Sequence, residues 1–141
     1  MAVTKKFTAN LSFDSSNIFP NSLRMNAGMT VTIDGDSATT GSLKVTSSDH
    51  IAIATSGTYG QGIDADSRAF VLVKNIGSNS DGDIEIQNES DARIAYVKAG
   101  EWAFLPFMHS SSAVSSCNIS GASATAGYCE FIVIETTTTD Y

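Results

Sequence analysis

The feature that most constrains the fold is an alternation of apolar and polar side chains with period two, strongest in residues 69–107. Side chains of a β-strand point to opposite faces in turn, so this period predicts strands with one face in a core. Breaks rich in Gly, Asn and Asp separate the strand-like runs, which are residues 70–73, 84–86, 94–97 and 102–104. The sequence therefore predicts consecutive antiparallel strands with no helix between them.

Similar patterns occur on both sides of this central region. Strands are predicted at residues 7–13, 29–33, 43–45, 51–53 and 128–135. Asp34-Gly35-Asp36 predicts a tight turn, because Gly accepts a positive φ. Residues 21–27 could hold a short helical turn around Leu23 and Met25, and the Gly-containing stretch 56–67 is expected to be the longest surface loop.

The length and the turn spacing define the fold class. A chain of 141 residues suits one domain, and no linker or internal repeat divides it. Short strands with frequent turn signals predict an all-β, single-domain antiparallel β-sandwich or jelly roll over residues 1–141, with a small barrel as the alternative. The residues expected in its core are Phe70, Leu72, Ile84, Ile86, Tyr96, Trp102, Phe104, Phe131 and Val133.

The charge balance argues against nucleic acid as a partner. The chain has a net charge of −7, and its eight basic residues are scattered apart from Lys5 and Lys6. Phosphate binding requires clustered Lys and Arg. No apolar run approaches a membrane span, and the stretch after Lys6 is too polar for the apolar part of a signal peptide. We expect synthesis in a cytoplasm and no membrane partner.

The two cysteines raise the question of a disulfide. If residues 114–119 pair with residues 128–134, Cys117 and Cys129 lie opposite each other, within disulfide range. The alternative is two reduced thiols that act as small buried hydrophobes. Zinc is not expected, because the two cysteines with His50 and His109 do not form a compact ligand set.

Acidic clusters resemble fragments of calcium loops without completing one. They are Asp81, Asp83 and Glu85; Asp34 and Asp36; and Asp64 and Asp66. The Asp-Gly steps fit hairpin turns better than metal sites. No Ser lies in a nucleophile elbow, His50 follows Asp49 in a polar turn, and His109 has no assignable partner. We therefore expect no catalytic residue, no cofactor and no metal, with bound calcium as the one alternative.

A family resemblance rests on three segments. They are the strand end Val73-Lys74-Asn75-Ile76-Gly77, the strand Ile84-Glu85-Ile86, and the hairpin Ala99-Gly100-Glu101 followed by Leu105-Pro106. In this order they resemble small jelly-roll virion structural proteins of tailed bacteriophages. The resemblance implies a non-enzymatic decoration (cement) protein on the capsid, or a component of the tail, fibre or head-to-tail junction.

Two functions of other classes stay open. A glycan-binding β-sandwich could stack sugar rings on Trp102, Tyr59 or Tyr96, although aromatic residues at strand spacing are more often core. An enzyme on a jelly-roll scaffold would need a metal site or nucleotide motif that the sequence does not show.

Assembly is expected to use the two ends of the chain. Residues 1–13 and 136–141 form outer segments with few charges and no Pro to block strand pairing. We expect a homo-oligomer, most simply a trimer, that binds the major capsid protein or another virion protein in the virion. The interface residues predicted on this basis are Lys5, Lys6, Phe7, Leu105, Pro106, Phe107, Met108, Thr136, Thr137, Thr138, Thr139 and Tyr141.

Overall fold

The computed structural model describes residues 5–15, 23–54, 68–108 and 116–136. None of these residues is helical, which confirms the all-β prediction. The strands of the described segments are β1 (Lys5–Ser15), β2 (Leu23–Val45), β3 (Ile51–Ala54), β4 (Arg68–Asn75), β5 (Ile84–Gln87), β6 (Arg93–Val97), β7 (Trp102–Met108), β8 (Cys117–Gly121) and β9 (Gly127–Thr136).

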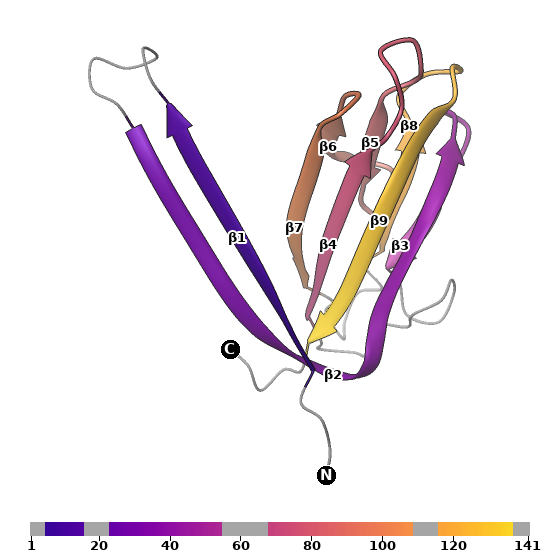
Figure 1. The fold of residues 1–141 in the computed structure, drawn as a ribbon. Helices are drawn as coiled ribbons and strands as arrows, with labels where there is room; N and C mark the ends of the chain where they lie inside the picture. Colours follow the sequence, from indigo (N-terminus) through magenta and orange to yellow (C-terminus); the bar gives the residue numbers. More distant parts are fainter. Residues whose placement is uncertain (1–4, 16–22, 55–67, 109–115, 137–141) are drawn as a thin grey trace.

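The strands form two antiparallel sheets that pack as a β-sandwich (Figure 1). Sheet A has five strands in the order β1-β2-β9-β4-β7, and sheet B has four in the order β3-β8-β5-β6. The strand β4 lies at the centre of the sandwich part of sheet A, between β9 and β7. Consecutive strands β4 and β5 belong to different sheets, so the chain crosses between layers there.

The core lies between the two sheets. Val71, Val73 and Val133 of sheet A are buried, as are Ile84 and Ile86 of sheet B. Because side chains alternate along β4, Leu72 and Lys74 lie on the outer face of sheet A. Both faces of this strand are apolar over residues 70–73, so only the packing of the two sheets decides which one is the core.

The core prediction is confirmed in part. Ile84, Ile86 and Val133 are buried between the sheets, and the half-buried Phe131 packs against this core. Phe70, Leu72 and Phe104 are buried or half-buried on the outer face of sheet A, so they do not belong to the core between the sheets. The core prediction is wrong for Trp102 and Tyr96, because these side chains are 54% and 42% exposed. In β7 the small residue Ala103 points toward the core side, which leaves its neighbour Trp102 on the outer face beside Lys74.

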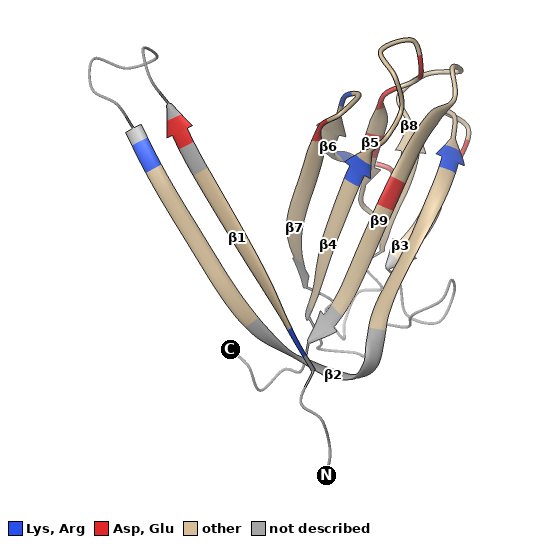
Figure 2. Ribbon diagram, viewed as in Figure 1, with Lys and Arg blue, Asp and Glu red and all other residues tan. Residues whose placement is uncertain are grey.

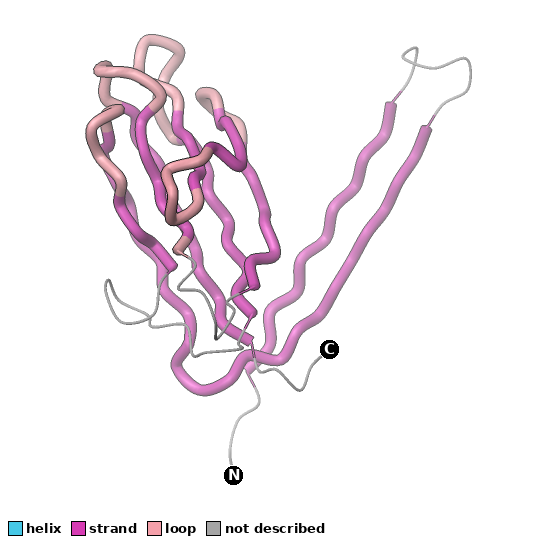
Figure 3. The backbone as a smooth tube through the Cα atoms, turned by 180° about the vertical axis from the view of Figure 1, so that it is seen from behind, coloured by secondary structure: helices cyan, strands magenta, loops and turns pink. Residues whose placement is uncertain are grey.

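The longest strand, β2, belongs to two parts of the molecule. Residues 23–33 pair with β1, and residues 38–45 pair with β9. Between them the register advances by five positions in β2 but by only two in β9, so β2 contains three extra residues. The strand bends sharply there, and the β1–β2 hairpin leaves the sandwich as a separate arm (Figures 1 and 3).

Two predictions are wrong at this strand. Asp34-Gly35-Asp36 does not close a tight turn but lies within the bend of one continuous strand. The helical turn proposed for residues 21–27 is extended from Leu23 onward, paired with β1. The loop expected at residues 56–67 lies outside the described residues.

One end of the sandwich is closed by loops held through carboxylates. Asp49 accepts hydrogen bonds from the backbone and hydroxyl of Thr46, and Asp81 does the same for Ser78. These hydrogen bonds lower the pKa of both carboxyl groups. The Asp81-Gly82-Asp83 step predicted as a hairpin turn instead lies on the crossing from β4 to β5, where the amide of Gly82 donates to Ala126.

Candidate functional site

The arm is a two-stranded hairpin with one apolar and one polar face. Residues opposite each other in an antiparallel pair share a face. Ala9 lies opposite Met29 and Leu11 opposite Ala27, so these side chains form an apolar face. The reverse face carries cross-strand polar contacts, which are Thr8 with Thr30, Ser12 with Asn26, and Asp14 with Arg24.

The apolar face of the arm and the outer face of sheet A form the walls of an open groove of about 910 Å³. The arm wall includes Phe7, Ala9, Leu11, Ala27 and Met29. The sheet wall includes Phe70, Leu72, Trp102, Phe104, Ile132 and Ile134. We call this space the arm groove. Most of its lining is hydrocarbon, which is typical of a surface that binds another apolar surface.

The two walls are in contact near the bend of β2. There the ring centroids of Phe7 and Phe70 are 5.3 Å apart, and Phe70 stacks on Phe104 at 5.7 Å. Farther along the arm Leu11 is 46% exposed and Met25 55%. On the sheet wall, Trp102 is 54% and Ile132 39% exposed. The arm groove is therefore closed at its base and open toward the tip of the arm.

Charged residues lie mainly at the ends of the walls (Figure 2). Among the described residues that line the arm groove, Lys74 alone is charged. The tip of the arm carries the exposed ion pair of Arg24 and Asp14, with 2.9 Å between Nη2 and Oδ2. The other charged residues of the described segments lie outside this lining.

The structure gathers several predicted interface residues at the base of the arm. Lys5 pairs with Ile33, which also pairs with Thr136, and Thr136 pairs in turn with Arg68. Met108 and Phe107 pair with Arg68 and Ala69 at the end of β7. The predicted residues Thr137, Thr138, Thr139 and Tyr141 lie outside the described part of the chain.

The other predicted interface residues differ in their surroundings. Lys6 is exposed, Phe7 packs on Phe70, and Pro106 is exposed. The place of Leu105 in an interface stays a prediction, and in the structure its half-buried side chain packs against the core between the sheets. The reason is again strand alternation, because Leu105 shares the inward face of β7 with Ala103.

The open part of the arm groove does not follow from the predictions made from the sequence. They place Met25 in a possible helical turn and Trp102 in the core, and they give Ile132 no site. The signal was present in residues 23–33, where Leu23, Met25, Ala27, Met29 and Val31 alternate with polar residues or Gly over one uninterrupted strand length. That period extends the strand predicted at residues 29–33 back to Leu23.

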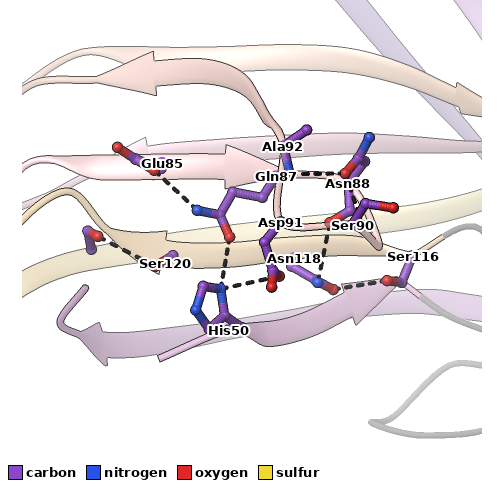
Figure 4. Close-up of polar contacts among 11 residues, drawn as sticks. His50, Glu85, Gln87, Asn88, Ser90, Asp91, Ala92, Ser116, Asn118 and Ser120 are labelled. Atoms are coloured by element: carbon purple, nitrogen blue, oxygen red, sulfur yellow. Dashed lines mark hydrogen bonds and ion pairs between the residues drawn. The ribbon is translucent and has the colours of Figure 1, made fainter. Parts of the chain in front are cut away.

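A second candidate site is a polar cluster on sheet B (Figure 4). The Nδ1 atom of His50 lies 2.9 Å from Oε1 of Gln87 and 3.1 Å from Oδ1 of Asp91. Gln87 donates through Nε2 to Glu85 at 3.0 Å, and Arg93 forms an ion pair with Glu85. The cluster joins the start of β3 to β5 and β6, so it acts as a polar brace.

The same cluster provides hydrogen-bond partners for buried polar side chains. Glu85, Gln87, Asn118 and Ser120 are each less than a tenth exposed. Asn118 donates to the backbone carbonyl of Asn88 and accepts from Ser116 (Figure 4). His50 itself is exposed, as the sequence predicted for a polar turn. His109 lies outside the described residues.

The acidic residues considered as calcium ligands each have a different hydrogen-bond or ion-pair partner. Asp81 holds the Ser78 turn, Asp83 accepts from the hydroxyl of Tyr96 at 2.7 Å, and Glu85 pairs with Arg93. Within the described ranges, no three His, Cys, Asp or Glu side chains are grouped to hold a metal ion. Asp64 and Asp66 lie outside those ranges.

The cysteines are free thiols, which corrects the disulfide interpretation. Cys117 belongs to sheet B and pairs with Ala54, whereas Cys129 belongs to sheet A between Leu43 and Asn75. The disulfide depended on pairing of residues 114–119 with residues 128–134, whereas residues 117–119 pair with β3 and β5. Burial raises the pKa of Cys117 to about 12 and that of Cys129 to about 11.

Comparison with known proteins adds no family assignment. No protein-family model matches the chain, and no curated protein has a similar sequence. Across the described segments no helix is long and apolar enough to span a bilayer.

Proposed function

We propose that this chain is a structural protein of a virus particle, of the capsid decoration type, which acts through assembly. The observation that carries the proposal is the arm groove, whose two apolar walls meet at the base and remain open toward the tip. Contiguous apolar surface of this kind on a soluble domain is typical of a protein interaction site.

The shape of the molecule supports a role in a lattice. The arm extends β1 and half of β2 away from the sandwich, with β1 at one edge of sheet A (Figure 1). An edge strand has unpaired backbone groups, and a neighbouring molecule can satisfy them. The proposed partners are further copies of this chain, most simply in a trimer, and the major capsid protein or another virion protein.

The segments that resemble phage virion proteins correspond to structural features of the sandwich. They form β4, β5 and the turn that leads into β7, where Gly100 has a φ of +78°. Many modest contacts of one protein on a repeating shell act at high effective concentration. The proposed role is to reinforce the shell by such contacts, with the tail or the head-to-tail junction as other positions in the virion.

Particle association tests this proposal. Purified protein is mixed with capsids of the virus whose genome encodes the chain, and binding is measured by co-sedimentation. We expect saturable binding at a fixed ratio to the major capsid protein, and detection of the chain by mass spectrometry in purified virions. Absence from virions together with failure to sediment with capsids would overturn the proposal.

Exposed aromatic residues favour glycan binding as a second candidate function. Trp102 on sheet A and Tyr96 on sheet B are both exposed, and such rings can stack on sugars. They lie on different sheets, and the Tyr96 hydroxyl is engaged by Asp83. Because Trp102 is the only tryptophan, its fluorescence reports directly on sugar binding. A saturable change on titration with oligosaccharides, abolished in Trp102→Ala, would support this function.

A further inference from the structure

We propose that the apolar walls of the open part of the arm groove are covered by exchange of arms with a second copy of this chain, so that each arm packs on sheet A of its neighbour. The apolar residues near the tip of one arm, Leu11 and Met25, would contact Trp102 and Ile132 of the neighbouring sheet. This inference rests on the proposed function and names the partner of the same site.

The two faces of the arm determine which surfaces can be matched. Each arm has one apolar face, and the part of the outer face of sheet A that lines the arm groove is apolar apart from Lys74. If a foreign arm were simply inserted between a chain's own arm and sheet, one polar arm face would oppose an apolar wall, and its hydroxyl and amide groups would lose hydrogen bonds to water. Exchange of arms between copies matches one apolar arm face to each sheet, so every apolar wall is covered.

The burial along the arm shows where exchange would act. The base is already covered, because Phe7 packs on Phe70 of the same chain. Leu11 and Met25, toward the tip, are about half exposed, and so is Trp102 on the sheet wall. The tip of a chain's own arm thus leaves both surfaces in water. A neighbouring copy presents the same exposed arm tip and the same exposed sheet wall, so each can cover the other.

The size of the surface suits repeated contacts. At about 3.3 Å per residue, the 11 residues of β1 span about 36 Å, and a two-stranded face is about 10 Å wide. A reciprocal exchange of whole arms would then cover at most about 1,400 Å², and exchange of the outer halves about half of that. The lower figure belongs to weak contacts, which become effective in a ring or lattice.

The connection at the base of the arm allows exchange at low cost. The arm and the sandwich are joined through the bend of β2, where three extra residues interrupt the pairing with β9. Through such a connection the arm can turn from its own sheet toward sheet A of a neighbouring copy, as in other exchanges of an identical element between copies. Most charges lie outside the two walls, so neither wall carries a charge cluster that would have to be buried.

Mixing of single-cysteine variants tests the exchange directly. Leu11→Cys protein is mixed with Ile132→Cys protein under mild oxidation, so that a heterodimeric disulfide can form only between copies. We expect this cross-link, while Ser12→Cys, on the polar face beside Leu11, gives none with Ile132→Cys. The native Cys117 and Cys129 are buried and do not compete. Equal cross-linking of the Leu11 and Ser12 variants, or none in either, would overturn the inference.

The association constant gives a second readout. In sedimentation, Leu11→Asp is expected to weaken self-association about tenfold or more, because a buried apolar contact is replaced by a charge, whereas Ser12→Asp leaves it within about twofold. Equal weakening in both variants would count against exchange. A double Leu11→Cys, Ile132→Cys protein that forms only an internal disulfide as a monomer would show that each arm closes on its own sheet instead. Neither result changes the test of the proposed function, because particle binding by the wild-type protein is measured separately.

Discussion

At the scale of single residues, the outer face of sheet A holds the most informative side chains. Trp102 lies opposite Lys74 in the β4–β7 pair, and both are exposed. One residue away along β4, Val73 is fully buried. The difference between a core position and an interaction position is thus a single step along the strand, because successive side chains point to opposite faces.

The first prediction concerns the stability of these two kinds of position. Trp102→Ala is expected to change the unfolding free energy by less than about 1 kcal/mol in dilute protein, because an exposed side chain contributes little to the core. Ile86→Ala, the control, is expected to cost about 2–5 kcal/mol, because Ile86 is fully buried. Urea denaturation measures both. A loss of about 3 kcal/mol or more in Trp102→Ala would place that ring in the core.

The second prediction concerns the buried thiols. Burial raises the pKa of Cys117 and Cys129 in the folded state, so the unfolded chain releases these protons at a lower pH. The unfolded state therefore binds fewer protons above about pH 9, and the unfolding free energy should fall as pH rises from about 9 toward 11 or 12. Cys117→Ala should reduce this slope, and a thiol reagent should label the wild type only after denaturation. Rapid labelling of folded protein at pH 8 would contradict the burial.

At the scale of structural elements, close backbone approaches hold the loop end of the sandwich together. The amides of Gly82 and Gly121 donate to the carbonyls of Ala126 and Thr46, respectively. A Cβ atom at Gly82 would lie 2.1 Å from the carbonyl oxygen of Thr125. The crossing from β4 to β5 can approach the start of β9 only because residue 82 has no side chain.

The third prediction follows from that contact. Gly82→Ala should destabilise the fold by about 1–3 kcal/mol or more, because the clash is with backbone and cannot be relieved by a side-chain rotation. Gly100→Ala is the control: a methyl group there meets nothing within 4 Å, so only the positive φ of 78° is penalised, at about 1 kcal/mol. Thermal denaturation compares the two. An equal effect of both substitutions would contradict the steric argument.

At the scale of the whole molecule, the apolar arm groove and the charged surface occupy different regions. The arm and the sandwich present apolar walls to each other, and among the described residues Lys74 alone carries a charge in that lining. Molecules with a net charge of −7 repel one another at low ionic strength. Self-association through the arm groove must therefore overcome a repulsion that does not arise in the groove itself.

The fourth prediction is the salt dependence of self-association. Added salt screens the repulsion between copies and leaves the apolar contact intact, so the association constant should rise between about 0.01 M and 0.15 M salt. Sedimentation equilibrium measures this change, and the emission of Trp102 should shift to shorter wavelength as the oligomer forms. Dissociation on adding salt would indicate an interface built on ion pairs instead.

The sequence by itself determined the secondary structure class and much of the core. Period-two alternation is a local property, so strands such as β1, β4 and β5 can be predicted without knowledge of their partners. The same property predicts that Ile84 and Ile86 share one face. It also indicates an Asp-Gly irregularity at residues 34–36, although not whether the chain turns back there or only bends.

The tertiary structure decided everything that depends on which strands meet. Both faces of β4 are apolar over residues 70–73. The position of sheet B therefore decides which face points inward. Cys117 and Cys129 stay apart because β8 and β9 belong to different sheets. The arm groove exists because β2 pairs with β1 at one end and with β9 at the other. Strand pairing joins residues far apart in the chain, and the local pattern of side chains carries no information about which distant strand is the partner.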